Sequence, residues 1–284
     1  MNLLKDFLKG ILIGIANIIP GVSGGTMAVS MGVYDQLIRA ITGLFKDFKR
    51  SMRILLPILL GAVAGIGALS FVIRYLLENY PLQTSTLFIG LILGGLPMLF
   101  SHVKGQKIKL PHIVLFIIFF AIVIAMAVVN GSSDSATDIA VNFGTVIQLF
   151  VIGMIASATM IIPGVSGSLV MMILGFYNII ISNISAMLTA LVSFEISGIL
   201  HGIGIFLPFG LGVLVGIGAV AKIIEWLFAK QPTLTYSAIF GLIIASPFAI
   251  IYKAGITGVS ILGILISIIT FAIGFCIAYF LGKE

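Results

Sequence analysis

Two short breaks in otherwise apolar sequence carry the groups most able to do chemistry. Each pairs a proline, which lacks an N–H and stops a helix, with glycines that allow a tight turn, and hydroxyl side chains follow. The next helix then begins with unpaired N–H groups and a dipole that favours an anion. We therefore expect the two breaks to form a phosphate or carboxylate site. Its predicted residues are Asn17, Pro20, Gly21, Ser23, Gly24, Gly25 and Thr26 in the first break, Pro163, Gly164, Ser166, Gly167 and Ser168 in the second, and Arg39.

A few ionisable residues lie near these breaks. Asp35 and Arg39 are four residues apart and share one helix face, so they can form an ion pair or present Arg39 to an anion. The alternative is an interfacial pair at the cytoplasmic end of the helix. Glu195 and His201 can bind a proton or cation or lie in a solvated loop. Asp35 and Glu195 are our candidates for coupling to a proton or sodium ion.

The breaks also allow a purely structural reading, in which Pro-Gly-Ser shapes a kink and the serines bond to preceding carbonyls. Their repetition favours a transport site. The phrase is not a phosphate-binding Walker loop, because it lacks the Gly-Lys-Ser/Thr ending. With one cysteine and three scattered histidines, the sequence predicts no metal site, no cofactor and no catalytic residue.

The two breaks belong to a duplicated unit. Seven consecutive residues at 18–24 recur identically at 161–167, 143 positions later, and Gly32 and Tyr34 recur as Gly175 and Tyr177 at the same shift. Further on, prolines and glycines recur at a shift of 151. These later matches pair Pro57, Gly61, Gly65, Gly67, Ala68, Pro81 and Gly90 with Pro208, Gly212, Gly216, Gly218, Ala219, Pro232 and Gly241.

The composition places these elements in a membrane. Hydrophobic residues make up 60% of the 284 residues and charged residues only 8%, against about 25% charged in soluble domains. Lipid-exposed backbone must satisfy its own hydrogen bonds, which favours helices. We predict an all-α polytopic membrane protein. The net charge of +6 does not indicate a nucleic-acid partner, because in a membrane chain the position of the charges matters more than their sum.

Apolar runs divide the chain into two similar halves, each with one broken or re-entrant helical hairpin and three transmembrane helices. The first repeat is predicted at 1–130, with its hairpin at about 11–45 and spans at about 54–73, 84–101 and 112–130. An external linker follows at 131–142. The second repeat is predicted at 143–284, with its hairpin at about 143–191 and spans at about 203–227, 234–252 and 259–281.

The positive charges predict an inverted-topology repeat. Eleven of the fifteen Lys and Arg residues fall on one face, which should be cytoplasmic, whereas Arg74 and Lys253 fall on the other. Both termini are then cytoplasmic, and three spans per half place the second repeat upside down, as in many secondary transporters. The inner group comprises Lys5, Lys9, Lys46, Lys49, Arg50, Arg53, Lys104, Lys107, Lys109, Lys230 and Lys283.

Charge does not separate hairpins from pairs of complete spans, because both give the same loop assignment. Length favours a hairpin for the first element, since its apolar run before Gly21 is too short for a core of about 30 Å at ~1.5 Å per residue. The pairs Gly61/Gly65 and Gly212/Gly216 have the small-xxx-small spacing of close helix packing. We read them as structural.

The paired Pro-Gly-Val-Ser-Gly phrases with their downstream Gly-x-Tyr resemble a bacterial and archaeal membrane family associated with polyprenyl-phosphate transport. The first copy, Asn17 to Thr26, is the more specific match, and the likeness covers nearly the whole chain. The resemblance implies a plasma-membrane translocase that returns undecaprenyl phosphate, the carrier of cell-wall precursors, from the outer to the inner leaflet. Ser168 stands where the first copy has Gly25, so the two breaks need not be equivalent.

Such a cargo suits the predicted site, because only the small anionic head must be shielded while the tail stays in lipid. Rocking of the two repeats would expose the site to each leaflet in turn. An ion-coupled carrier of a small soluble anion would use the same architecture with a closed aqueous path. A membrane lipid phosphatase is a third reading, but it would need clustered histidines and acids. The oligomeric state cannot be read from the sequence.

Overall fold

The computed structural model describes residues 3–17, 19, 22–129, 139–256 and 259–282. Throughout these residues the regular structure is α-helical and no strand occurs, so the all-α prediction is confirmed. The helices are α1 (Leu3–Ala16), α2 (Gly24–Ser30), α3 (Tyr34–Thr42), α4 (Phe48–Asn79), α5 (Pro81–Gly94), α6 (Leu96–Val103), α7 (Leu110–Val128), α8 (Phe143–Ile161), α9 (Gly167–Ile173), α10 (Tyr177–Ser193), α11 (Ile196–Lys230), α12 (Pro232–Lys253) and α13 (Ile261–Gly282).

Seven of the helical segments in the described part of the chain are long and apolar enough to cross a membrane. They are α4, α5 and α6 taken together, α7, α8, α11, α12 and α13. Many of their large apolar side chains are exposed, as expected of surfaces that face lipid. The pair α9 and α10 is bent by 106° at its break. The chain is therefore a multi-pass membrane protein with a broken helical segment.

The chain forms two compact units that cut across the sequence repeats. The first unit contains Met1–Val128, Ile162–Val165 and Ala221–Glu284, and the second contains Val129–Ile161 and Ser166–Val220. The short second-break segment Ile162–Val165 thus belongs to the same unit as the whole first break.

The order and starting points of the helices repeat along the chain. The helix after each break begins at Gly24 or Gly167, and the next at Tyr34 or Tyr177, in both cases 143 residues apart. Gly32 and Gly175, which precede the latter helices, both adopt left-handed φ angles, of +67° and +78°. Only glycine adopts this conformation without cost. The duplication seen in the sequence therefore extends to the local backbone.

Glycines allow the first helix of each repeat to pack closely on the fourth. In the first unit, Gly61 and Gly65 of α4 lie against the backbone of α1 at Phe7 and Ile11, where a Cβ on either glycine would overlap backbone atoms. In the second unit, Gly212 and Gly216 of α11 lie in the same way against α8. Their contacts there are Phe150 and Met154, which are 143 residues after Phe7 and Ile11. The small-xxx-small prediction is confirmed.

Helix α1 runs parallel to α4 and ends beside its middle. Gly10 lies against Ile58 and Gly14 against Ala62, so the two helices advance in the same direction. After α1 ends at Ala16, α4 continues for about 20 Å at 1.5 Å per residue. The first break therefore lies beside the middle of a 32-residue helix. With 14 residues, α1 is about 21 Å long and falls short of a core of about 30 Å.

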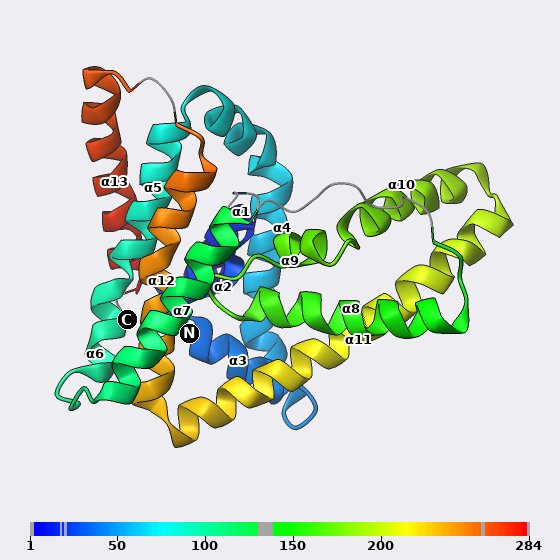
Figure 1. The fold of residues 1–284 in the computed structure, drawn as a ribbon, viewed down its shortest axis with the longest axis horizontal. Coiled ribbons are helices and arrows are strands. Elements are labelled where there is room, and N and C mark those ends of the chain that lie inside the picture. The colour runs from blue at the N-terminus through cyan, green and yellow to red at the C-terminus, as the bar shows by residue number, and fades with distance from the viewer. Residues whose placement is uncertain (1–2, 18, 20–21, 130–138, 257–258, 283–284) are drawn as a thin grey trace. The chain divides into compact units, whose positions relative to one another are not determined.

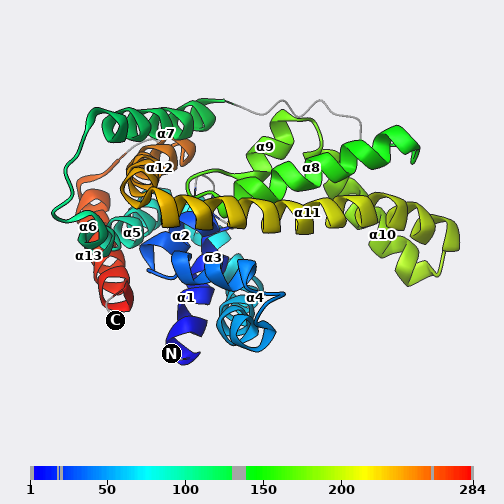
Figure 2. The same cartoon turned by 90° about the horizontal axis from the view of Figure 1, so that it is seen from below.

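Within the first unit, the last two spans of each repeat pack on spans of the other repeat. Helix α5 packs along α13, and its counterpart α12 packs along α7, the counterpart of α13 (Figure 1; Figure 2). Glycines make both contacts close, because Gly90 meets the backbone of Phe271 and Gly241 meets that of Phe116. The start of α12 lies beside the end of α6, so the equivalent segments α5–α6 and α12 run in opposite directions. An inverted repeat requires this antiparallel arrangement.

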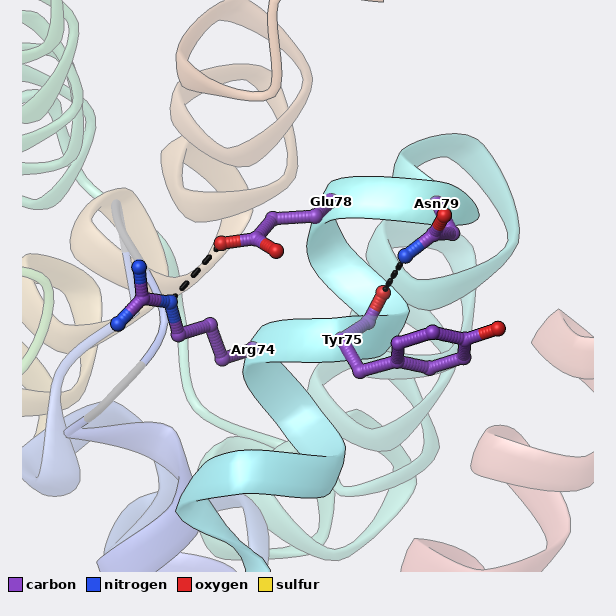
Figure 3. Close-up of polar contacts among 4 residues, drawn as sticks. All are labelled: Arg74, Tyr75, Glu78 and Asn79. Carbon is purple, nitrogen blue, oxygen red and sulfur yellow. Dashed lines mark hydrogen bonds and ion pairs between the residues drawn. The ribbon is translucent and has the colours of Figure 1, made fainter.

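The end of α4 carries the ion pair found among the described residues. Arg74 Nε donates to Glu78 Oε1 at 2.9 Å, and Asn79 Nδ2 donates to the Tyr75 carbonyl at 2.9 Å (Figure 3). Both charged side chains are exposed, so the pair contributes little to stability in water. The span predicted to end at about residue 73 thus continues as helix to Asn79.

Candidate functional site

The first break is held together by Asn17. Its Nδ2 donates to the Ile13 carbonyl at 2.9 Å, near the end of α1, and its Oδ1 accepts from the Gly24 N–H at 3.3 Å, at the start of α2. One amide thus satisfies a free carbonyl on one side of the break and a free N–H on the other. Pro20 and Gly21, which we predicted as site residues, lie outside the described residues.

Ser23 and Thr26 form a buried hydroxyl pair at the start of α2. Ser23 is the N-cap residue, and its Oγ accepts from the Thr26 N–H at 3.1 Å, as is usual for a serine cap. The two hydroxyl oxygens are 2.9 Å apart, and the residues are 6% and 0% exposed. Gly24 and Gly25 are buried beside them in the first turn of the helix.

The second break supplies an N–H to this hydroxyl pair. The Gly164 N–H donates to Ser23 Oγ at 2.9 Å and to Thr26 Oγ1 at 2.6 Å. Gly164 has φ of +77°, and a Cβ there would lie 3.2 Å from the Leu242 carbonyl oxygen, so both conformation and space favour glycine. Pro163 beside it is buried. The structure therefore brings together residues from the two repeated phrases, which are about 140 positions apart in sequence.

Among the described residues, one hydroxyl proton of the junction has no acceptor. Ser23 and Thr26 carry two hydroxyl protons, and one of these makes the bond between the two oxygens. Each oxygen already accepts from Gly164, and no described residue accepts the second proton. The pair can thus donate to an anionic oxygen without losing the contact between the breaks.

Ser166, Gly167 and Ser168 belong to the second unit. Ser166 caps α9 by accepting from the Leu169 N–H at 3.4 Å, and its Oγ lies 3.1 Å from Ser168 Oγ. This copies the cap at Ser23. However, Leu169 occupies the position equivalent to Thr26, and Ser168 is exposed. The two breaks are therefore similar in backbone and different in their polar groups.

A second polar region lies at the other end of α2. It is a cavity of about 210 Å³ within the first unit, and its polar lining comes from α3, α6 and α12. Since α2 has seven residues, the cavity and the hydroxyl junction are about 10 Å apart along the helix. The polar and ionisable lining residues are Tyr34, Asp35, Gln36, Arg39, His102 and Tyr236.

Asp35 and Arg39 share this cavity but are not paired as the sequence suggested they could be. Asp35 Oδ2 accepts from Tyr236 Oη at 3.3 Å, and among the described residues no ion pair joins Asp35 to Arg39. Arg39 is an exposed side chain at the cavity. Presentation of Arg39 to an anion and an interfacial position for this side chain both stay predictions.

Glu195 belongs to the second unit, whereas the hydroxyl junction and the cavity belong to the first. It occupies the turn between α10 and α11, is exposed, and accepts from Ser197 Oγ at 2.9 Å. Both readings of Glu195, a solvated loop and a proton or cation site, stay predictions. No group of three or more His, Cys, Asp or Glu side chains that could hold a metal is found in the part of the chain the structure describes.

Two cavity residues were missed by the sequence analysis. His102 adjoins the basic loop that contains Lys104, Lys107 and Lys109, and Tyr236 lies in an apolar run, so neither stands out as a site residue in the sequence. In the structure their rings stack with centroids 5.1 Å apart, and His102 Nδ1 lies 3.0 Å from the Met98 carbonyl. The sequence has no local signal for this contact, because it depends on the antiparallel placement of α6 and α12.

Comparison with known proteins places the chain among lipid-phosphate transporters. The undecaprenyl phosphate translocase-like family model matches residues 13–209 and 202–283. A Staphylococcus aureus protein named polyprenyl-phosphate transporter is 32% identical over 282 residues, which cover 98% of this chain and 95% of that protein. A Vibrio cholerae protein of the same name is 27% identical over 261 residues, covering 87% of this chain and 77% of that protein. No solved structure matches the chain.

Proposed function

Because the chain belongs to the undecaprenyl phosphate translocase-like family, we propose that it carries a polyprenyl phosphate across the plasma membrane. The lipid carrier, undecaprenyl phosphate in our proposal, moves from the outer to the inner leaflet and so returns to cell-envelope synthesis. Relatives covering nearly the whole chain are named for this transport, which supports the assignment. As a member of a family named for translocation, the chain is a transporter and not an enzyme.

The observation that carries the proposal is the hydrogen bonding of Gly164 to Ser23 and Thr26. It joins the two repeated phrases at buried polar groups beside the middle of a membrane-length helix. A phosphate head needs such groups because it cannot enter hydrocarbon unaided, whereas its tail can stay in lipid. The head group accepts the remaining hydroxyl proton of the pair, and N–H groups of the broken segments complete its binding.

Transport proceeds by alternating access, in which the two repeats rock about the shared junction. The antiparallel course of α5–α6 and α12 supports an inverted repeat. The shortness of α1 supports a re-entrant first hairpin. With the basic loops on the cytoplasmic side, both termini are cytoplasmic. Asp35 and Glu195 remain the candidates for coupling transport to a proton or sodium ion. Asp35 is the stronger one, because it lines a cavity and accepts from Tyr236, whereas Glu195 is exposed in a turn.

Reconstitution tests the proposal directly. The protein is placed in vesicles that contain undecaprenyl phosphate, and exposure of the phosphate in each leaflet is followed with and without proton and sodium gradients. We expect protein-dependent loss of asymmetry between the leaflets. If no gradient gives flipping while soluble phosphate enters the vesicles, the small-anion carrier is the correct function. Release of inorganic phosphate from the lipid would instead indicate the phosphatase.

Matched variants test the site. Thr26→Val removes the hydroxyl while keeping the shape of the side chain, and we expect at least a tenfold loss of flipping. Thr26→Ser keeps the hydroxyl and should retain most of the activity. Ser246→Ala is the control, because Ser246 is equally buried but bonds only to the Leu242 carbonyl of its own helix. Equal flipping by the Thr26→Val variant and the control would reject the hydroxyl junction as the head-group site.

A further inference from the structure

The cavity between α3, α6 and α12 has a defined set of donors and acceptors. The carbonyl of Met98 can only accept, so the hydrogen bond at 3.0 Å requires His102 Nδ1 to carry the proton. The neutral ring then has its Nε2 as an acceptor. Asp35 adds a carboxylate acceptor, and Arg39 adds a permanent cation. The lining thus combines one cation with two groups that accept protons.

A ligand matched to this lining must bring both a negative charge and a proton to donate. A singly protonated phosphate monoester has both, because its second pKa is about 6 and one P–OH remains in an appreciable fraction near neutral pH. Its anionic oxygens can bond Arg39, and its P–OH can donate to Asp35 or His102. Sulfate has the same shape but no proton at neutral pH, so its oxygens would face the Asp35 carboxylate without a hydrogen bond.

We propose that the cavity lined by Asp35, Arg39, His102 and Tyr236 is a second phosphate site, which selects a phosphate group carrying one proton. Tyr236 holds Asp35 in place through the 3.3 Å hydrogen bond and stacks on His102. The inference rests on the proposed function, because it adds a waiting position for the same head group. That position is one α2 length, about 10 Å, from the hydroxyl junction.

The proton that the ligand carries sets the expected pH dependence of binding. The titratable and charged groups that line the cavity are Tyr34, Asp35 and Arg39 from α3, His102 from α6 and Tyr236 from α12. A phosphate dianion has no P–OH to donate to Asp35 or His102, so the form that the lining selects is the monoanion, and above neutral pH most phosphate is dianionic. One proton is therefore taken up with each ligand above neutral pH. The affinity should fall about tenfold per pH unit there.

The test uses the full chain in lipid nanodiscs, titrated with inorganic phosphate and with sulfate by calorimetry. We expect wild-type protein to bind phosphate at least tenfold more tightly than sulfate, with the pH dependence given above. Asp35→Asn replaces an acceptor with an amide that can donate, so the preference should fall to about threefold or less. Glu78→Gln, on the exposed end of α4, is the control and should leave the preference unchanged. Arg39→Gln should lower the affinity for both anions.

Equal binding of phosphate and sulfate by wild-type protein would overturn the assignment, as would an unchanged preference in a folded Asp35→Asn variant. Failure of wild-type protein to bind phosphate would do the same. A further arm adds a monoalkyl phosphate to the nanodiscs. Displacement of inorganic phosphate identifies the lipid head group as a ligand of this cavity. Binding of phosphate without displacement would reject the cavity as a waiting position for the lipid head group. Flipping in the vesicle assay tests lipid transport independently, so the two proposals fail separately.

Discussion

The hydrogen bonds between the two breaks predict that substituting Ser23 and Thr26 together lowers the free energy of unfolding by more than the sum of the two single substitutions. Ser23→Ala removes an acceptor for Gly164 and the cap of α2, and should lower the free energy of unfolding by about 1–2 kcal/mol. Thr26→Val removes the other acceptor from a fully buried position, at about 0.5–1.5 kcal/mol. After either change alone, the Gly164 N–H still has one hydroxyl acceptor.

Two effects of opposite sign decide the energy of the double variant. Each single change breaks the bond between the two hydroxyls, whereas the double variant loses that bond only once. The sum of the two single costs therefore exceeds the cost of the double variant by about 1 kcal/mol from this effect. Only the double variant leaves the Gly164 N–H without an acceptor inside the protein, at about 1–3 kcal/mol. The second effect is larger. We expect Ser23→Ala with Thr26→Val to cost about 1 kcal/mol more than the sum of the single changes.

A second hydroxyl pair in the same unit provides the control. Thr86 on α5 and Thr270 on α13 have hydroxyl oxygens 2.8 Å apart, and each oxygen also lies within hydrogen-bond distance of a carbonyl of its own helix. No N–H depends on this pair, so its double valine variant should cost less than the sum of the two single variants. The assay is equilibrium unfolding in mixed micelles. If the Ser23 and Thr26 variants are also less than additive, the Gly164 N–H finds another partner and our account of the junction is wrong.

Glycine substitutions give two more predictions. Gly164→Ala should destabilise the protein by about 1–2 kcal/mol because of its left-handed φ, whereas Gly67→Ala, which faces open space in α4, should be neutral or stabilising in the same unfolding assay. Gly90→Ala and Gly241→Ala should each cost about 1–3 kcal/mol, since both would press a Cβ into the backbone of the partner helix. A large loss of stability for Gly90→Ala with none for Gly241→Ala would contradict the equivalent packing of α5 on α13 and of α12 on α7.

The breaks and close helix contacts were readable from sequence because each depends on a local property. A proline and glycines stop a helix wherever they occur in an apolar run. Gly61 and Gly65 likewise form a smooth face through their own spacing, and α1 lies on that face. The contact of Gly164 with Ser23 spans 141 positions and depends on how the two repeats fit together. No spacing within either phrase contains that information.

The partners of the last helices were hidden for a different reason. Helices α7 and α13 are apolar on all sides, so their hydrophobic pattern does not distinguish a protein-facing side from a lipid-facing one. The informative residues are glycines: Gly90 and Gly241 on the opposite helices, and Gly274 on α13 itself. The cavity was missed for the same reason, because His102 and Tyr236 meet only once α6 and α12 are placed antiparallel.

The differences between the repeats argue for one composite site at the junction and against two equivalent sites. The first repeat contributes hydroxyls from Ser23 and Thr26, and the second contributes the N–H of Gly164. At the equivalent positions the second repeat has Leu169 in place of Thr26 and Asn178 in place of Asp35. It therefore lacks the groups needed to build a second copy of the junction or of the charged cavity. Duplication supplies the two helix breaks. Because their side chains have diverged, one break supplies the N–H donor and the other supplies the hydroxyl acceptors. This division suits a single head group bound between the two breaks.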